Sequence, residues 1–449
     1  MLGPVRFFAL SFGCVVGSGW VVVLGDWLRA CGPAGVVLGM LAGASVMLAN
    51  SGAYAELIAR YPMAGGEFIY AQQVFGDRTA FIVGWLSTLS LIAVAVFEAT
   101  ALPWLLETLL PGLKGPTLYV SLGTPVTADA LAIGLIGTAV VAIMNYRGAR
   151  SAATLQTVLA FMFLTLAVLI ITLGLALGSR SNLMPLFRAD RANPWWVGAL
   201  WIFAIAPFFL NGFQSVAQTV EERTERVTYA RIASCMALAL LAGTGFYCLV
   251  TLAAASAQPW PALLDQPMVT AAAFANLLPH HALSVLVLVT AALSVARVWN
   301  GVTIWTTRLL MAQARAGFLP AGLGAVHPRH GSPTRAVLFV AACTGVGACL
   351  GRGVIIPVVD MASLCLAGCL VLSGAAALTA RATRPGVAPY RTPGGAATLL
   401  YALLGSAGMA AFALLDPILR RPGQVPIEWI VAGAWTAVGI LFWCARRER

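Results

Sequence analysis

Two short stretches inside apolar segments contain residues that weaken or end helices. Gly17-Ser18-Gly19 lie within residues 7–30, and Pro207-Phe208-Phe209-Leu210-Asn211-Gly212 lie within residues 195–218. A helix that stops leaves free carbonyls behind it and free N–H groups where it resumes. The N–H groups favour anions and the carbonyls favour cations. Each stretch therefore predicts a place where backbone groups bind a charged part of a small molecule.

Four charged side chains inside apolar segments need an explanation: Asp26, Glu98, Arg297 and Asp360. Asp360 lies near a probable outer boundary and is expected to be solvated. A charge in the middle of a bilayer costs at least about 2.5–3.5 kcal/mol, so such residues usually face a cavity and have partners. Arg297 either pairs internally with Glu98 or Asp26, since a guanidinium suits a carboxylate, or faces a cavity and recognises an acidic substrate. The sequence leaves this choice open.

Composition indicates what kind of elements carry these residues. The chain has 449 residues, of which 60% are hydrophobic and 10% charged, and its mean hydropathy is +0.88. A helix that crosses a bilayer needs about 20 mostly apolar residues. The sequence predicts an all-α membrane protein with twelve such helices, over residues 7–30, 34–57, 80–106, 129–146, 152–178, 195–218, 229–256, 282–311, 334–350, 358–379, 396–415 and 427–444.

The net charge of +11 has a topological explanation. With twelve crossings and both termini inside the cell, most of the basic residues fall in loops on the inner side, as the positive-inside rule expects. No nucleic-acid partner is therefore predicted. The nine cysteines lie mostly within apolar segments and show no paired spacing, so neither a metal site nor a disulfide framework is expected.

No connection is long enough to form a soluble domain, so any function must be built from the helices. The two interrupted helices are the first and the sixth, five helices apart. Paired interruptions at corresponding positions are typical of transporters with inverted repeats, whose broken helices line a central site. The alternative is that these glycines serve close helix packing, as small residues often do in membranes.

Four stretches along the chain resemble bacterial amino acid permeases of the amino acid–polyamine–organocation superfamily. They occur in the order and spacing of that family: YAELIARYPMAGGEFIYAQQVFG (54–76), PFFLNGFQSVAQTVEE (207–222), WNGVTIWTTRLLMAQARAGFLP (299–320) and YRTPGG (390–395). The resemblance implies a LeuT-like core of two inverted five-helix repeats, residues 1–180 and 181–385, and two peripheral helices in residues 386–449. It also implies transport of amino acids or close derivatives by alternating access.

A zwitterionic substrate would use both sides of a broken helix. Its carboxylate would accept from the N–H groups of Ser18, Gly19 and Trp20, and Gly17 would allow close approach. Its ammonium would bind the carbonyls of Cys14, Val15, Phe208 and Phe209. By resemblance, Phe208 is the aromatic gate over the substrate, and Asn211 and Gly212 complete the second break.

Coupling is expected to use H⁺ or Na⁺ and no other cofactor. Some proton-linked relatives carry a lysine in the fifth span, where this chain has Phe163. Because burial disfavours the charged form of a carboxylate, Glu98 is the candidate proton carrier.

The chain is therefore predicted to be a permease of the cell inner membrane, with both termini cytoplasmic and with the substrate and the bilayer as its partners. One alternative is an amine or organic-acid carrier that uses Arg297, Glu98 and Asp26 as substrate ligands. Another is an amino acid sensor without transport. No enzyme is expected, because no nucleophile, base and orienting residue fall together. Residues 107–128 contain no cysteine, so no disulfide-linked glycoprotein partner is expected.

Overall fold

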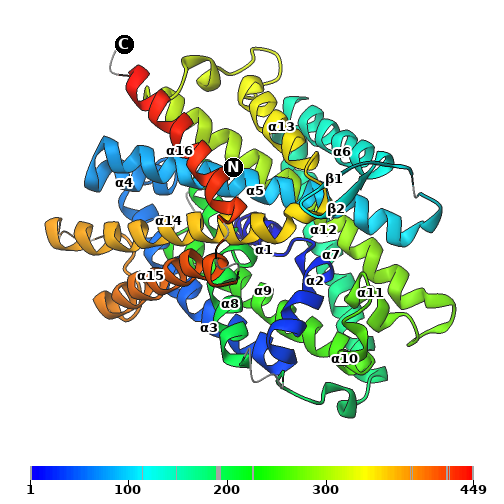
Figure 1. The fold of residues 1–449 in the computed structure, drawn as a ribbon. Coiled ribbons are helices and arrows are strands. Elements are labelled where there is room, and N and C mark those ends of the chain that lie inside the picture. The colour runs from blue at the N-terminus through cyan, green and yellow to red at the C-terminus, as the bar shows by residue number, and fades with distance from the viewer. Residues whose placement is uncertain are drawn as a thin grey trace.

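The computed structural model describes residues 3–446 apart from 114, 148, 189–193, 225–226, 385, 387, 421–422 and 424 (Figure 1). Its α-helices are α1 (Pro4–Val15), α2 (Gly19–Val22), α3 (Leu24–Arg60), α4 (Glu67–Phe75), α5 (Asp77–Leu109), α6 (Ala128–Arg147), α7 (Ala149–Leu177), α8 (Trp195–Phe209), α9 (Tyr229–Ala257), α10 (Trp260–Leu263), α11 (Val269–Phe274), α12 (Ala282–Arg315), α13 (Thr334–Ala348), α14 (Ile355–Thr383), α15 (Gly395–Arg420) and α16 (Ile427–Arg446). The 3₁₀-helices and strands are η1 (Pro111–Leu113), η2 (Arg180–Leu183), η3 (Phe213–Gln218), η4 (Val220–Glu222), η5 (Pro279–His281), η6 (Ala321–Gly324), η7 (Arg352–Val354), β1 (Thr117–Ser121) and β2 (Thr124–Thr127).

The helices are those of a multi-pass membrane protein. Eleven helical segments of the described residues are long and apolar enough to cross a bilayer. A further apolar helix, α13, has 15 residues, fewer than the roughly 20 that a full crossing needs. Twelve crossings therefore stay a prediction.

A glycine separates the first two predicted spans within α3. Gly32 has φ 73° and ψ 169°, a conformation that only glycine adopts readily, and Pro33 follows it at the start of the next helical stretch. A Cβ at Gly32 would lie 2.9 Å from the backbone nitrogen of Arg188 and from the carbonyl oxygen of Leu186. The sharp turn between the first two spans thus depends on glycine both for its dihedral angles and for space.

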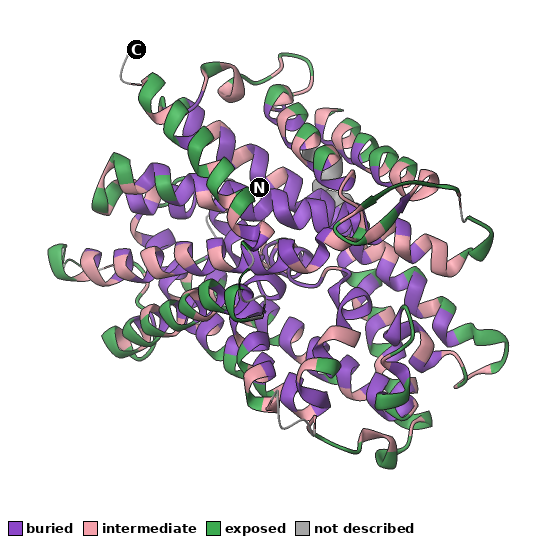
Figure 2. Ribbon diagram, viewed as in Figure 1, coloured by how far each residue is buried: buried purple, intermediate pink, exposed green. Residues whose placement is uncertain are grey.

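Burial divides the helices into a centre and a periphery (Figure 2). In the most apolar stretch of α5, 89% of residues are buried inside the protein, whereas the corresponding share is 11% for α16 and 22% for α6. Helix α5 packs against α12 and α14, and α1 packs against α7, α9 and α12. Helices α1, α5 and α12 therefore form the interior in which charged side chains need partners.

The stretch 54–76 and the stretch 390–395 meet at a buried carboxylate. Glu56 accepts hydrogen bonds from Arg381 Nε at 2.7 Å, from Arg381 Nη2 at 2.5 Å and from Arg60 Nη2 at 3.2 Å. It also accepts from the backbone nitrogen and the hydroxyl of Thr392, both at 3.0 Å. These bonds connect α3, α14 and the segment that leads into α15, which gives both stretches a structural role.

Helix α4 adds a second internal contact to the same stretch. Glu67 is buried and accepts hydrogen bonds from the Ser87 hydroxyl and, at 3.5 Å, from the Tyr54 hydroxyl. Burial raises the pKa of the Glu67 carboxyl above its usual range. The carboxyl thus fixes the loop between α3 and α5 from within.

The connection after α5 contains a β-hairpin that the sequence did not predict. Strands β1 and β2 pair antiparallel, and the two residues between them, Leu122 and Gly123, have φ values of 48° and 74°. Positive φ at both central residues is typical of the type I′ turn, which is rarely built on leucine. The hairpin is held to the rest of the protein by the Tyr119 hydroxyl, which donates to the Cys349 carbonyl at 2.6 Å.

Replacing Glu56 by alanine is expected to lower the free energy of unfolding by about 3 kcal/mol, because two guanidinium groups lose their buried partner. The measurement is equilibrium unfolding in mixed micelles. Asp77→Ala is the matched control: Asp77 pairs with Arg446 at 2.7 Å but its side chain is 48% exposed, against 0% for Glu56. The control should lose less than about 1 kcal/mol. Equal losses in the two variants would contradict a stabilising role for the buried Glu56 cluster.

Candidate functional site at the two helix breaks

The first helix is interrupted where its glycines predicted. Helix α1 ends at Val15, Val16 is extended, and α2 begins at Gly19. The carbonyls of Val15 and Val16 and the N–H of Ser18 therefore lie outside the helical hydrogen-bond pattern. In a bilayer interior such groups need other partners.

The partner of the N–H side is Glu98 of α5. The Ser18 backbone nitrogen donates to Oε1 of Glu98 at 3.3 Å, and the Ser18 hydroxyl donates to Oε2 at 2.6 Å. Both residues are buried. A Cβ at Gly17 would overlap the Oε1 atom of Glu98, so the absence of a side chain at Gly17 makes room for the carboxylate.

The partners of the carbonyl side are Arg297 of α12 and Tyr247 of α9. Arg297 is fully buried, and its Nη2 donates to the Val16 carbonyl. Its guanidinium lies 4.4 Å from the ring centroid of Phe163 and 5.2 Å from that of Phe12, within cation–π range. The Tyr247 hydroxyl donates to the Val15 carbonyl at 3.4 Å.

Asp360 was expected to be solvated, but it is 5% exposed and accepts from Trp201 Nε1 at 3.1 Å. The structure also corrects two of the predicted charge partnerships. Asp26 pairs with Arg29 at 3.3 Å and its side chain is 44% exposed, so it is not the partner of Arg297. No ion pair within 4 Å joins Arg297 to Glu98 in the described part of the chain; the two side chains bind opposite sides of one helix break instead. Helix periodicity shows neither the exposure of Asp26 nor the partner of Arg297, because a backbone carbonyl that acts as a partner has no characteristic residue in the sequence.

The second break lies directly against the first. Helix α8 ends at Phe209, two residues after Pro207, and the chain continues as η3 from Phe213. Gly212 between them has φ 121°, and a Cβ there would lie 2.8 Å from the carbonyl carbon of Cys14. The sequence separates the breaks by about 190 residues, and the fold brings their backbones into contact.

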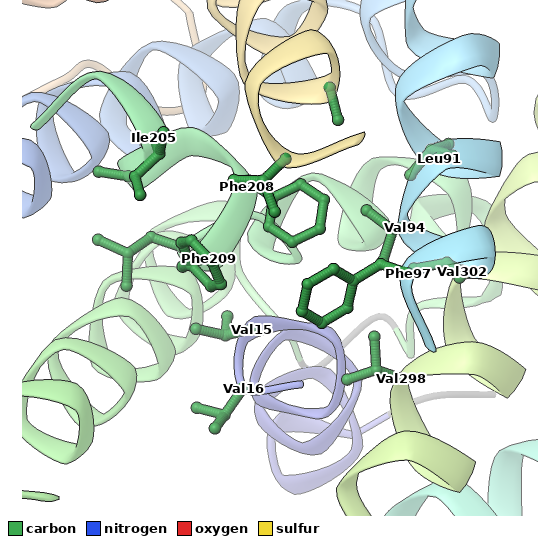
Figure 3. Packing of buried hydrophobic residues seen from close by; sticks show 14 of the residues in the cluster. Val15, Val16, Leu91, Val94, Phe97, Ile205, Phe208, Phe209, Val298 and Val302 are labelled. Carbon is green, nitrogen blue, oxygen red and sulfur yellow. The ribbon is translucent and has the colours of Figure 1, made fainter. Parts of the chain in front are cut away.

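Aromatic rings surround the point where the breaks meet (Figure 3). The ring of Phe208 lies 5.2 Å from that of Phe97 and 5.0 Å from that of Phe209. Phe209 in turn packs edge-on against Trp27 at 4.9 Å and would overlap a Cβ at Gly19. Trp20 of α2 packs edge-on against the ring of Phe246 of α9 at 5.3 Å.

The amide of Asn211 is a neutral polar group at the second break. Asn211 is 1% exposed, and neither its side-chain nitrogen nor its side-chain oxygen has a hydrogen-bond partner. An unpaired buried amide costs free energy. Its two free atoms are therefore available to a ligand that both donates and accepts.

Two cavities flank this region. Cavity A has a volume of about 620 Å³ and is lined by residues that include Ala99, Thr100 and Ser284. Cavity B has a volume of about 540 Å³ and is lined by residues that include Gln218 and Ile304. Ser284 and Ile304 are 20 residues apart on α12, about 30 Å at 1.5 Å per residue. The cavities thus open at opposite ends of α12, with Arg297 between them.

Sequence reasoning missed several residues of the site. Phe97, Tyr247 and Trp27 contact the breaks but lie in long apolar segments where aromatic residues are common. Only the position of Phe97 next to Glu98 was a usable signal. No three His, Cys, Asp or Glu side chains of the described residues gather as metal ligands.

Gly17→Ala is expected to lower the free energy of unfolding by about 1–3 kcal/mol, because the new methyl group displaces Glu98 from the Ser18 N–H and leaves both unpaired. Gly245→Ala in α9 is the control, since a Cβ there meets nothing within 4 Å. The control should be neutral or up to about 1 kcal/mol more stable. Unfolding equilibria of the two variants test this, and a harmless Gly17→Ala would contradict the tight fit.

The amino acid permease family model matches residues 2–442. The methylthioribose transporter of Bacillus subtilis (strain 168) is 25% identical over 442 residues, which cover 96% of this chain and 90% of that protein. The branched-chain amino acid permease of Lactococcus lactis subsp. cremoris (strain MG1363) is 26% identical over 336 residues, 72% of this chain and 70% of that protein.

A plant protein is similar as well. The vacuolar cationic amino acid transporter 8 of Arabidopsis thaliana is 27% identical over 346 residues, which cover 74% of this chain and 55% of that protein. The family model extends over nearly the whole chain, and the relatives are transporters and permeases. The chain therefore belongs to the amino acid permease family of the amino acid–polyamine–organocation superfamily.

Proposed function

We propose that this protein is a secondary transporter that carries a small organic solute through the point where its two broken helices meet. The observation that carries the proposal is the contact of Gly212 with Cys14 and Val15, with cavities A and B at the two ends of α12. A site between two cavities suits alternating access, in which one side opens while the other closes.

The proposed architecture is a LeuT-like pair of inverted repeats. Residues 1–180 and 181–385 would form the repeats and residues 386–449 the peripheral helices; the boundary at residue 385 lies outside the described residues. The first and sixth helices are then equivalent elements, which accounts for a break in each. The contact between the two breaks, at Gly212 and Cys14, supports this division.

The proposed location is the inner membrane with both termini in the cytoplasm. Pro4 lies near the start of α9, where its carbonyl accepts from Cys235 Sγ at 3.5 Å, and Arg446 pairs with Asp77 at the start of α5. The loop before α5 in turn contacts the segment before α9, since the Ala64 nitrogen donates to Glu221 at 2.8 Å. The two described chain ends thus share the face of cavity B, which supports an even number of crossings.

The names of the relatives suggest two kinds of substrate. The family and the Lactococcus permease suggest amino acids or close derivatives, with the carboxylate on the N–H groups of Ser18, Gly19 and Trp20. The Bacillus relative suggests methylthioribose, an uncharged sugar with a thioether. Coupling to H⁺ or Na⁺ would drive either transport, with Glu98 as the group that carries a proton.

An uptake screen in proteoliposomes tests the proposal. Radiolabelled leucine, methylthioribose and simple amines are offered under a pH gradient and a sodium gradient, each imposed separately. Saturable uptake of one solute that depends on a gradient is expected. Saturable binding without uptake under every gradient would contradict the transporter and favour a sensor.

Phe208→Ala is expected to lower uptake about tenfold, since the loss of a buried aromatic contact of about 1.4 kcal/mol corresponds to that factor. Trp196→Ala on the same helix is the control, because Trp196 is 53% exposed and Phe208 is 6% exposed. Initial uptake rates at equal protein content measure both. Equal effects of the two changes would place Phe208 outside the transport path.

A further inference from the structure

One of the three N–H groups that would bind the carboxylate of an amino acid, that of Ser18, is already used within the protein. Glu98 accepts from both the backbone nitrogen and the hydroxyl of Ser18, so one carboxylate takes two donors. It also fills the space beside Gly17 through which a ligand would approach the backbone. A substrate carboxylate would have to displace a buried side chain of the same charge.

Of the carbonyls that would bind an ammonium, that of Val15 is used in the same way, and so is the neighbouring Val16 carbonyl. The Val16 carbonyl accepts from Arg297 and the Val15 carbonyl from Tyr247. A substrate ammonium near Val16 would also meet the positive charge of Arg297. The guanidinium is held between the rings of Phe12 and Phe163, so its position is fixed by packing.

We infer that Glu98 and Arg297 stand in for the two charged ends of an amino acid, and that the transported solute is an uncharged molecule with hydroxyl or amide groups and an apolar part. This inference rests on the proposed transport function and names its substrate class. A zwitterion would meet the Glu98 carboxylate at Ser18 and the Arg297 guanidinium at Val16, each of the same charge as the substrate group that would bind there.

The groups left over fit such a molecule. The Nε and Nη1 atoms of Arg297 are buried without a hydrogen-bond partner and can donate to a hydroxyl or amide oxygen. Asn211 is buried with a free donor and a free acceptor, which is what a hydroxyl or an amide pairs with. Phe97 and Phe208 present apolar ring surface beside the break. An uncharged polar ligand satisfies Asn211 without leaving a charge in a low-dielectric interior.

Uptake of the uncharged thiosugar of the screen, with leucine as competitor, tests this in reconstituted wild-type protein, and leucine binding tests it in two variants. In the wild type, a hundredfold excess of leucine should leave thiosugar uptake unchanged. Glu98→Ala frees the Ser18 donors and should tighten equilibrium binding of leucine about tenfold over the wild type, which corresponds to about 1.4 kcal/mol. Binding is measured for the variants because uptake would also change with the loss of a proton carrier. Asp77→Ala is the control, because it removes a half-exposed carboxylate that pairs with Arg446 away from the break, and its leucine binding should stay at the wild-type level.

Saturable leucine uptake by the wild type would overturn the inference and leave the transporter intact. Inhibition of thiosugar uptake by leucine in the wild type would overturn it as well, even if neither variant folds. The absence of gradient-driven uptake of any solute would instead contradict the proposed function itself. Tighter leucine binding in Glu98→Ala alone supports the assignment of Glu98 as the internal carboxylate.

Discussion

The interior of a membrane protein offers no water to unpaired backbone groups, and this constraint governs the arrangement around the first helix break. The interruption between Val15 and Gly19 removes helical partners at a depth where other helices must supply replacements. Glu98 from α5, Arg297 from α12 and Tyr247 from α9 do so. Three helices are thereby bound to one point on α1, which makes the break a centre of packing as well as a candidate binding site.

Buried carboxylates away from the break anchor the helices that surround it. The Glu56 cluster joins α3 to α14, and Glu67 fixes the loop that leads into α5, so the start of the helix that carries Glu98 is anchored. Two glycines allow close packing at the first break. Gly17 makes room for the Glu98 carboxylate, and Gly212 lets the backbone of the second break approach α1. The anchored loops and the two glycines thus both support the arrangement around the first helix break.

Both helix breaks could be predicted from sequence, because Gly17-Ser18-Gly19 and Pro207 to Gly212 disturb helix geometry locally. The partners of Arg297 could not, since a carbonyl acceptor and two aromatic rings have no characteristic spacing. Asp26 was misplaced for a related reason: an apolar segment gives the length of a span but not the depth of each residue, and Asp26 pairs with Arg29 at a half-exposed position. The inverted repeats remain a prediction, because local residue patterns give no chain direction in space.

The pairing of opposite charges at the first break has an electrical consequence. A membrane potential of 100 mV does work of about 2.3 kcal/mol on each elementary charge that crosses it. Glu98 and Arg297 bind atoms only two residues apart on the same segment, so a movement of α5 and α12 together with that segment displaces a negative and a positive charge together. While Glu98 is ionised, the potential then does almost no net work on these two charges, and any voltage dependence of a transport cycle would come from the ion that accompanies the solute, including a proton carried by Glu98.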